Sequence, residues 1–329
     1  MDSFRSFNGT LLLALDGTEH FASQAIHCAP CATRRHANGQ VTYCHSALTP
    51  VLVKPGCDKV IALAPEFVTP QDGAAKQDCE INTAQRWLAA HGAVLARLKT
   101  TVLGDDLYCH EPFCRLLLAG GLAFILVCKP TSHPTDYEWL EHLERNGAVR
   151  TVTRTHWTGQ RRETDTYRSA HSIPLRDADD ALEVNGCELV TTDDSGKVRY
   201  RNACATSLAV DDSNIPEVVA AGRGRWKIEN ENHNTLKTQG YHFEHHFGHG
   251  RQHLSSLLAS LIILAFLTHT VLEWMDDEYR LLRKKLPSRQ RLFNDIRTLT
   301  SYRCFETWEA LMDFMLASFE PVPAKPETG

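Results

Sequence analysis

Residues 100–128, TTVLGDDLYCHEPFCRLLLAGGLAFILVC, predict the centre of the fold. Thr100–Leu103 is a short apolar run that predicts a strand, Glu111–Ala119 has helical spacing, and Leu122–Cys128 is a longer apolar strand. An alternation of strand, helix and strand is typical of a sheet with at least one parallel pair of strands. Sites in such sheets lie at the carboxyl ends of the strands, where this chain has Asp105.

A second strand of this kind lies near the start of the chain. Leu11–Leu15 is apolar throughout and is followed at once by Asp16, so this carboxylate also stands where a strand ends. The alternative for Asp16 is an ordinary turn residue before glycine. An antiparallel meander is predicted to continue from this strand, followed by a helix. The predicted ranges are Val41–Leu48, Val51–Lys54 and Val60–Ala64 for the strands and Asp72–Leu98 for the helix.

Composition limits the class of protein. The chain has 329 residues, 43% of them hydrophobic, which is enough for a large core in one or two domains. Its net charge of −5 excludes a generally basic nucleic-acid-binding protein, so any such contact has to come from local basic patches. The first ten residues are polar, without a signal peptide, and eleven cysteines, an odd number, are typical of reduced thiols. These features predict a cytoplasmic protein.

Cysteines and histidines are concentrated between residues 27 and 45. Cys28 and Cys31 have the Cys-x-x-Cys spacing of half a zinc site, but no second pair of this kind follows. His36, Cys44 and His45 would have to supply the remaining ligands. Two interpretations therefore stay open: a structural zinc ion, or ordinary reduced cysteines.

The region after residue 150 is predicted to be a β-rich insertion. Its hairpin-type turn signals are Thr158-Gly159, Asn185-Gly186 and Ser195-Gly196. Arginines are spread through the region, with Trp157 and Tyr167 between them. One interpretation is a solvated charged face, and the other is a strand platform that contacts a nucleic-acid backbone and stacks on its bases.

The stretch Gly222–Lys237 contains no proline and predicts a helix with Arg225, Glu229 and Lys237 along a polar side. On a helix, Arg225 and Glu229 are one turn apart and differ by roughly 40° in heading. An arginine in that position can hold the carboxylate or bind a phosphate with two parallel hydrogen bonds. The alternative is a solvated ion pair.

The C-terminal part is predicted to be helical. Gln239–Gly250 is rich in histidine but fits no closed zinc pattern, so it predicts a polar loop. Leu254–Leu272 is apolar but interrupted by serine, threonine and histidine and is not flanked by basic residues at both ends, which favours a buried core helix over a membrane span. The tail after Pro321 is predicted to be disordered.

Basic residues follow the apolar segment. Between Arg280 and Arg297 there are seven lysines and arginines, with Asp295 as the only counter-charge. Within this stretch Arg283, Lys284 and Lys285 form a candidate phosphate-contacting surface. The alternative is a solvated helix face.

Three motifs in chain order resemble the Asp-Asp-Glu transposases of bacterial insertion sequences. They are Leu-Ala-Leu-Asp16-Gly-Thr, Val-Leu-Gly-Asp105 and Arg225-Trp-Lys-Ile-Glu229. The group that this chain resembles has a long β insertion before the glutamate and an Arg-x-x-x-Glu…Lys signature. The similarity covers about residues 11–250 and is specific only as a combination of motifs.

The resemblance implies a ribonuclease H-like α/β fold, in which helices flank a mixed sheet, a β-rich insertion interrupts it, and a helical C-terminal part follows. The predicted division is a catalytic core in two parts (1–146 and 208–250), the insertion (147–207), a helical region (251–320) and a disordered tail (321–329).

The resemblance also implies the chemistry. Asp16, Asp105 and Glu229 would be the catalytic carboxylates that bind two Mg²⁺ ions, with Mn²⁺ as a substitute, while Arg225 and Lys237 would contact DNA phosphates. Two hard cations about 4 Å apart activate the attacking water or 3′-hydroxyl and stabilise the leaving oxygen. Without metal, clustered carboxylates repel one another and raise the pKa of at least one of them.

Departures from the family pattern leave alternatives for two of the carboxylates. Gly222 stands where the family commonly has a tyrosine, and the interval from Glu229 to the lysine is one residue longer than usual. Glu231 is therefore an alternative third carboxylate, although on an α-helix it lies roughly 200° around from Glu229. Asp106 is the corresponding alternative to Asp105.

Two functional hypotheses follow. The first is an active transposase that cuts and rejoins double-stranded DNA at transposon ends and target, as a homodimer. The second is an inactive or truncated remnant that only binds DNA, because just fifteen residues precede Asp16 whereas relatives usually carry a separate N-terminal DNA-binding region.

Overall fold

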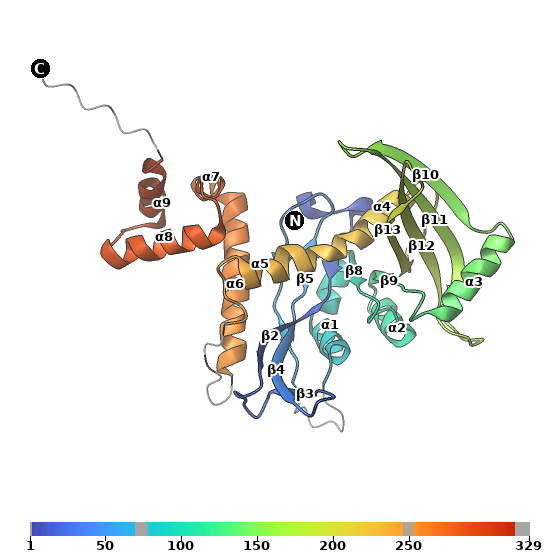
Figure 1. Cartoon of the computed structure of the whole chain (residues 1–329), viewed down its shortest axis with the longest axis horizontal. Helices are drawn as coiled ribbons and strands as arrows, with labels where there is room; N and C mark the ends of the chain where they lie inside the picture. The colour runs from blue at the N-terminus through green and yellow to red at the C-terminus, as the bar shows by residue number, and fades with distance from the viewer. Residues whose placement is uncertain (1, 70–77, 246–247, 249–252, 320–329) are drawn as a thin grey trace, which may run out of the picture.

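The computed structural model describes residues 2–69, 78–245, 248 and 253–319. A large mixed sheet lies at its centre, with strand order β10-β11-β12-β13-β9-β8-β1-β5-β6 (Figure 1). β1 (Leu11–Ala14), β8 (Thr100–Gly104) and β9 (Ala123–Val127) are parallel neighbours, whereas β5 (Val51–Val53) and β6 (Ile61–Ala62) complete one side antiparallel to them. The prediction of a mixed α/β fold around a parallel pair is confirmed.

Alternation along the buried strands divides the interior into two cores. Leu11 and Leu13 face one side of the sheet, and Leu12 and Ala14 face the other, because successive side chains of a strand point in opposite directions. The first side is covered by α1 (Glu80–Arg97) and α2 (Glu111–Ala119), and the second by the helices that follow residue 214. Burial on both faces explains why these strands are continuous apolar runs.

The first hairpin is split between two sheets. β1 pairs with β5 in the large sheet, and the same two chain segments continue as β2 (Gly17–Ser23) and β4 (Val41–Leu48) in a small sheet. Asp16 lies at this division, where its carbonyl accepts a hydrogen bond from the Thr49 N–H at 3.1 Å. The small sheet has the order β2-β4-β3, with β3 at Ala32–Arg35 and β7 at Glu66–Phe67 paired to β4.

The predicted meander is thus wrong in one respect, because the strand at 41–48 pairs with β2 and β3 rather than within the large sheet. Neither β2 nor β3 is evident from the sequence, since both are short and polar and are stabilised by pairing with β4.

The β-rich insertion extends the large sheet. Its strands are β10 (Arg150–Trp157), β11 (Arg162–Pro174), β12 (Glu183–Asp193) and β13 (Val198–Thr206), and β13 pairs antiparallel with β9. The turns at 158–161 and 194–197 are confirmed.

The prediction of a turn at Asn185-Gly186 is wrong, because both residues lie inside β12. A Cβ on Gly186 would lie 2.7 Å from Ile173 Cδ1, so this glycine allows close packing against the neighbouring strand. The connection from β11 to β12 runs instead through residues 175–182, where the Leu175 N–H donates to the Leu182 carbonyl at 3.0 Å.

A nearly continuous helical run crosses the second face of the sheet (Figure 1). It consists of α4 (Ile215–Arg223), a 3₁₀ segment η3 (Gly224–Trp226), a π segment η4 (Ile228–His233) and α5 (Asn234–Thr238). The predicted helix at 222–237 is therefore part of a longer run, and its centre is wound more loosely than an α-helix. π segments are rare and are frequent at functional sites.

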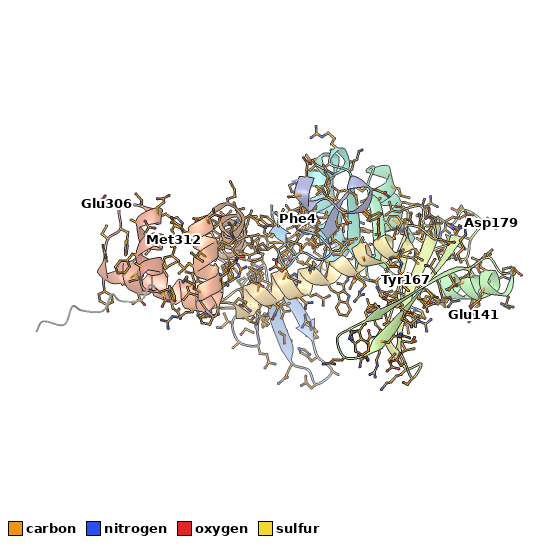
Figure 2. The ribbon with its side chains drawn as sticks, turned by 90° about the horizontal axis from the view of Figure 1, so that it is seen from above. Phe4, Glu141, Tyr167, Asp179, Glu306 and Met312 are labelled. Carbon is orange, nitrogen blue, oxygen red and sulfur yellow. The ribbon has the colours of Figure 1, made fainter. Side chains whose placement is uncertain are left out.

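The C-terminal helices lie at the opposite end of the molecule from the insertion (Figure 2). They are α6 (Leu254–Met275), α7 (Asp277–Lys285), α8 (Arg289–Tyr302) and α9 (Trp308–Ala317). α7, α8 and α9 share a separate small core around Tyr279, Leu282 and Met312. The tail predicted to be disordered, 321–329, lies outside the described residues.

The prediction that α6 is a buried core helix is wrong. Only 22% of its most apolar stretch is buried, and it is the one helix in the described part that is long and apolar enough, by length and composition alone, to cross a membrane. One side faces the protein through Ile263, Phe266 and Thr270, while Leu257 and Leu264 on the other side are each 55% exposed. An apolar sequence does not by itself show whether other parts of the protein cover all sides of the helix.

Two further helix bounds differ from expectation. α1 begins at Glu80, with Cys79 in extended conformation before it, and the earlier part of the predicted helix at 72–77 lies outside the described residues. α3 (Pro134–Arg145) was not predicted and packs on β11.

Candidate functional site: four carboxylates at the strand ends

Asp16 and Asp105 come together because their strands are parallel neighbours. Ala14 on β1 is opposite Leu103 on β8. Asp16 and Asp105 each lie two residues after this pair, so they lie at the same level of the sheet. The Asp105 Oδ1 accepts a hydrogen bond from the Leu107 N–H at 2.9 Å, which fixes the turn after β8. Both carboxylates are partly exposed at the same edge of the sheet.

Arg225 and Glu229 reach this edge from the helical run. The segment η3 packs against β1 and β8, so Arg225 is buried beside the aspartates. Its Nη1 donates to Glu229 Oε1 at 2.7 Å, whereas the Glu229 side chain is 50% exposed. The arginine therefore orients a carboxylate that is open to solvent.

Glu80, which was not predicted, is a fourth carboxylate in the site. It is the first residue of α1, and its Oε1 accepts a hydrogen bond from the Tyr108 hydroxyl at 2.6 Å. A Cβ on Gly17, the residue after Asp16, would lie 2.4 Å from Glu80 Oε2, so only glycine allows this approach. An acidic residue at a helix start is a common capping preference, and the sequence therefore carries no signal that separates Glu80 from a cap.

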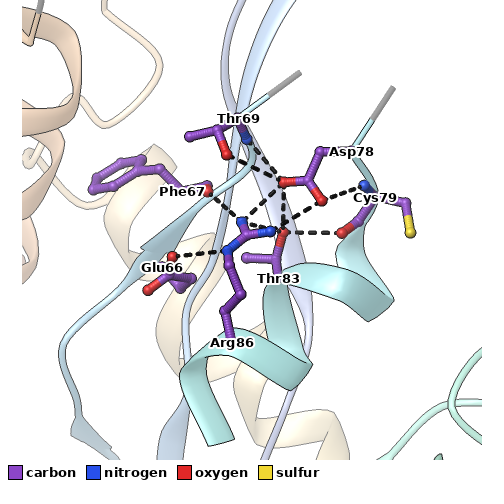
Figure 3. A network of polar contacts seen from close by, with 7 residues as sticks. All are labelled: Glu66, Phe67, Thr69, Asp78, Cys79, Thr83 and Arg86. Atoms are coloured by element: carbon purple, nitrogen blue, oxygen red, sulfur yellow. Dashed lines mark hydrogen bonds and ion pairs between the residues drawn. The ribbon is translucent and has the colours of Figure 1, made fainter. Parts of the chain in front are cut away.

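A network of polar contacts determines where α1 begins and thus where Glu80 lies (Figure 3). Arg86 donates from Nη2 to Asp78 Oδ2 at 2.8 Å and from Nη1 to Oδ1 at 3.1 Å. Burial would raise the pKa of Asp78, but hydrogen bonds from Arg86 and from the N–H groups of Thr69 and Cys79 lower it below its ordinary value. The Asp78 side chain is fully covered, so this bidentate pair anchors the first turn of α1 to the strand segment before it.

Burial, together with repulsion between carboxylates, raises the pKa of acidic groups in the site. Burial, followed by the charge of Glu80, raises the pKa of Asp16 to about 7, with further increases from Asp105 and Glu229 that are opposed by Arg225. The neighbouring carboxylates thus contribute to the raised pKa of Asp16, but burial is the larger cause. Burial also raises the pKa of Glu80, although hydrogen bonds from Tyr108 and the Gly17 N–H oppose the effect.

His233 lies behind Asp16. Its Nε2 is 2.7 Å from Thr49 Oγ1, and its Nδ1 is 3.8 Å from Asp16 Oδ2. Burial and the nearby charges of Lys237 and Arg225 lower the pKa of His233 to about 4. The imidazole is therefore neutral at physiological pH, and its contact with Asp16 is not an ion pair.

The structure distinguishes the alternative carboxylates. Asp106 points away from the cluster, where it accepts hydrogen bonds from the Lys129 N–H at 2.7 Å and the Ser132 hydroxyl at 2.5 Å. Glu231 pairs with Lys227 at 3.2 Å, whereas Glu229 is among the charges that raise the pKa of Asp16. The geometry thus brings Asp105 and Glu229 toward Asp16 rather than their neighbours.

The π segment affects where Lys237 lies relative to Glu229. A π turn takes in one more residue than an α turn, so the heading of Lys237 around the helical run from Glu229 differs from the one that α-helical spacing would give. Lys237 follows on α5, where its Nζ is 2.7 Å from Glu244 Oε1. Gly222 is pressed against the sheet, since a Cβ there would lie 3.0 Å from Ile125 Cγ2, and a tyrosine has no room.

The predicted basic surface does not form a single face. Arg283 points inward, where its Nε lies 3.6 Å from Glu273 Oε1, and Arg289 binds the same carboxylate at 3.0 Å. Lys284 and Lys285 are exposed. Of the three predicted DNA contacts on α7, only these two lysines are therefore accessible.

Most arginines of the insertion are already paired with acids. Arg168 and Arg201 both bind Glu188, and Arg199 binds Asp193. This favours the paired, solvated interpretation for that part of the insertion.

One aromatic residue of the insertion, Tyr200, packs against the helical run that carries Arg225. Arg223 lies 4.5 Å over the ring of Tyr200, whose ring also packs edge-on against Trp226 at 6.3 Å between centroids. Trp226 is 49% exposed and directly follows Arg225. The sequence offered no signal for this group because Tyr200 and Trp226 meet only through the fold.

The carboxylates have the chemistry of a site for a hard divalent cation. Asp16, Asp105, Glu229 and Glu80 offer only oxygen donors, and their negative charges raise the pKa of Asp16 in addition to the effect of burial. Among the described residues, however, no three of these carboxylates have oxygens that all lie within 4.8 Å of one another. The arrangement is thus wider than a closed cage for a single ion.

Comparisons with protein-family models and with curated proteins find no match to this chain.

Proposed function

We propose that the protein is a metal-dependent DNA-cleaving and strand-transferring enzyme, a transposase of the Asp-Asp-Glu class. The single observation that carries this proposal is the convergence of Asp16, Asp105 and the Arg225–Glu229 pair at one sheet edge. These residues come from three segments that are far apart in the sequence, and they are the residues of the three motifs.

The topology supports a ribonuclease H-like fold as part of the proposal. An antiparallel meander of β1, β5 and β6 is followed by two strands, β8 and β9, that lie parallel to β1 and are each reached through a helix. This is the strand arrangement that such a fold requires. The insertion between β9 and the helical run extends the sheet without disturbing this order.

Each side chain of the site has a separate role in the proposed reaction. Asp16, Asp105 and Glu229 would hold Mg²⁺ or Mn²⁺, which when bound supplies activation of the attacking oxygen and stabilisation of the leaving oxygen. Arg225 keeps Glu229 in place through its 2.7 Å hydrogen bond and offsets part of the carboxylate charge. Glu80 is positioned to share in cation binding, and its bond to Tyr108 holds it there.

DNA would approach the exposed side of this edge. Trp226 and Tyr200 supply aromatic surface beside Glu229, and Arg223 adds a positive charge over that surface. Stacking of this kind suits unpaired or distorted bases near a cut. Lys237 is accessible to a phosphate if the phosphate replaces Glu244 as its partner.

The exposed side of α6 supports the proposed homodimer. Residues 254, 257, 261, 264, 268, 271 and 275 are all exposed, and they alternate at intervals of three and four. Six of the seven are Leu, Val or Met. This is the a/d spacing of a two-helix pair, and 22 residues give it a length of about 33 Å. A second copy of α6 offers the same stripe and is therefore the partner that we propose.

The test is cleavage of a DNA fragment that carries the terminal repeats of the element encoding the protein. We expect wild type to cleave in the presence of Mg²⁺ or Mn²⁺, and Asp105→Asn and Glu229→Gln to lose cleavage while still binding the DNA. Glu231→Gln and Asp106→Asn serve as matched controls, because they are the neighbouring acids that point elsewhere.

Other outcomes would lead to different conclusions. DNA binding by wild type without cleavage would support the remnant that only binds DNA. Loss of cleavage in Glu231→Gln but not in Glu229→Gln would assign the third carboxylate to Glu231.

A further inference from the structure

A second group of metal-ligating side chains lies in the small sheet, away from the carboxylates. Cys28 and Cys31 are in the connection between β2 and β3, and His45 is on β4. The distance from Cys28 Sγ to Cys31 Sγ is 3.5 Å, and His45 Nε2 lies 3.2 Å from the first sulfur and 3.3 Å from the second. The three ligand atoms therefore form a nearly equilateral triangle.

The size of this triangle fits a tetrahedral metal ion. Zinc bonds of about 2.0 Å to nitrogen and 2.3 Å to sulfur at a tetrahedral angle place a sulfur and a nitrogen roughly 3.5 Å apart and two sulfurs roughly 3.8 Å apart. The observed separations, 3.5 Å between the sulfurs and 3.2 and 3.3 Å from sulfur to nitrogen, are each shorter than these values by only about 0.2–0.3 Å. The two sulfurs are too far apart for a disulfide, whose S–S bond is about 2.05 Å.

The surrounding structure holds the triad in place. The Cys31 N–H donates to the Cys28 carbonyl at 3.1 Å, which closes the turn, and the Cys28 N–H donates to Cys31 Sγ at 3.3 Å. An N–H directed at a sulfur stabilises negative charge on it, as in the outer shell of zinc sites. The His45 ring contacts two aromatic neighbours, His20 at 5.9 Å and Phe21 at 5.8 Å between centroids.

We propose that Cys28, Cys31 and His45 bind a zinc ion that ties the β2–β3 connection to β4. Thiolate and imidazole ligands select zinc over magnesium, so this site is chemically distinct from the carboxylate edge. The described part of the chain supplies three of the four ligands of a tetrahedral ion, and a water molecule or one further side chain completes the coordination. His36 and Cys44, the other sequence candidates, point elsewhere, to Thr42 Oγ1 at 2.8 Å and the Ala32 carbonyl at 3.8 Å.

A structural zinc ion would stabilise the small sheet and the connection between β2 and β3. The small sheet projects from the molecule (Figure 1), and residues 33–35 of β3 are exposed. Residues 24–31 connect β2 to β3 without a strand or helix. A metal bridge supplies stability that such a small apolar core cannot provide.

The test is the zinc content of the 329-residue chain, purified without a polyhistidine tag under reducing conditions and in Mg²⁺-containing buffer. We expect about one zinc ion per chain for wild type and loss of at least most of it in Cys28→Ser and Cys31→Ser. Cys44→Ser is the matched control, because this buried neighbour on β4 points away from the triad. Cys128→Ser controls for the other cysteine and histidine group, formed with Cys109 and His133.

A second measurement uses wild type alone, in case the serine variants do not fold. A mercurial reagent that modifies thiols should release the zinc in parallel with modification, and Co²⁺ substitution should give a sulfur-to-metal charge-transfer band. Wild type without zinc, zinc retained in Cys28→Ser and Cys31→Ser, or zinc lost only in Cys128→Ser would each overturn the proposal. None of these readouts involves DNA cleavage, so the outcome is independent of the proposed function.

Discussion

Replacement of Asp16 by asparagine should stabilise the metal-free protein at alkaline pH and leave its stability unchanged at acidic pH. Burial and the charge of Glu80 raise the pKa of the Asp16 carboxyl from 3.8 to about 7. Between these two values the folded protein holds a proton that the unfolded chain has lost. The free energy of unfolding therefore decreases as pH rises from about 4 to 7, and the loss is complete above pH 7.

The magnitude follows from the size of this change. A shift of one pKa unit corresponds to roughly 1.36 kcal/mol. The difference of about 3 between the two pKa values therefore sets an upper limit of about 4 kcal/mol on the change in the free energy of unfolding. Because the Asp16 side chain is 19% exposed and faces solvent beside Glu229, screening reduces the expected effect to about 1–2 kcal/mol. The free energy of unfolding of Asp16→Asn should therefore exceed that of wild type by about 1–2 kcal/mol at pH 8 but by less than about 0.5 kcal/mol at pH 4.5.

The assay is urea unfolding of both proteins at pH 4.5, 6 and 8 without added divalent ions. Glu231→Gln is the control, because this acid is paired with Lys227 and should show no such pH-dependent gain. Addition of Mg²⁺ should stabilise wild type and close the gap at pH 8, since the ion binds only the ionised site. A difference between Asp16→Asn and wild type that stays constant or shrinks as pH rises would refute the reasoning.

The remaining predictions concern three other parts of the molecule. Arg86→Leu leaves the fully buried Asp78 without its partner and should cost about 2–3 kcal/mol in urea unfolding, against less than about 0.5 kcal/mol for the exposed Arg97→Leu on the same helix. Glu80→Gln should weaken the Mg²⁺-induced rise in melting temperature without abolishing it, measured by calorimetry. Leu261→Glu, in the centre of the exposed stripe of α6, should shift the protein from dimer to monomer in analytical ultracentrifugation.

Each of these has an outcome that would count against it. Equal costs for the two arginine variants would show that the network in Figure 3 does not anchor α1. An unchanged Mg²⁺ response in Glu80→Gln would remove that residue from the cation site. A wild-type protein that is monomeric at all concentrations would exclude the self-pairing of α6.

The central strands and the helix between them could be predicted from the sequence because their signals are local. The helix at 111–119 is confirmed at both bounds, and the strands at 100–104 and 123–127 agree with prediction to within one residue. A strand buried on both faces has to be apolar along its whole length, and an aspartate directly after such a run marks its end. Asp16 and Asp105 could therefore be placed at the sheet edge without coordinates.

Other features depend on contacts between distant segments. β2 and β3 form because β4 pairs with both of them, and nothing in their own residues predicts a strand. Asn185-Gly186 has the residues of a tight turn but lies within β12, since the close approach of Ile173 requires a glycine there.

Within the site, the sequence by itself determined which residue types stand at the ends of the strands and on the helical run. Only the tertiary structure decided that Glu80 joins them, because the Asp78–Arg86 pair sets the start of α1 and Gly17 admits its carboxylate. Glu229, in contrast, is favoured over Glu231 by the sequence itself, because it lies one helical turn from Arg225, and the structure pairs these two residues at 2.7 Å. The physical reason for the difference is that residue type and spacing specify local conformation, whereas burial, charge and distance at a site arise from segments that meet only when the chain folds.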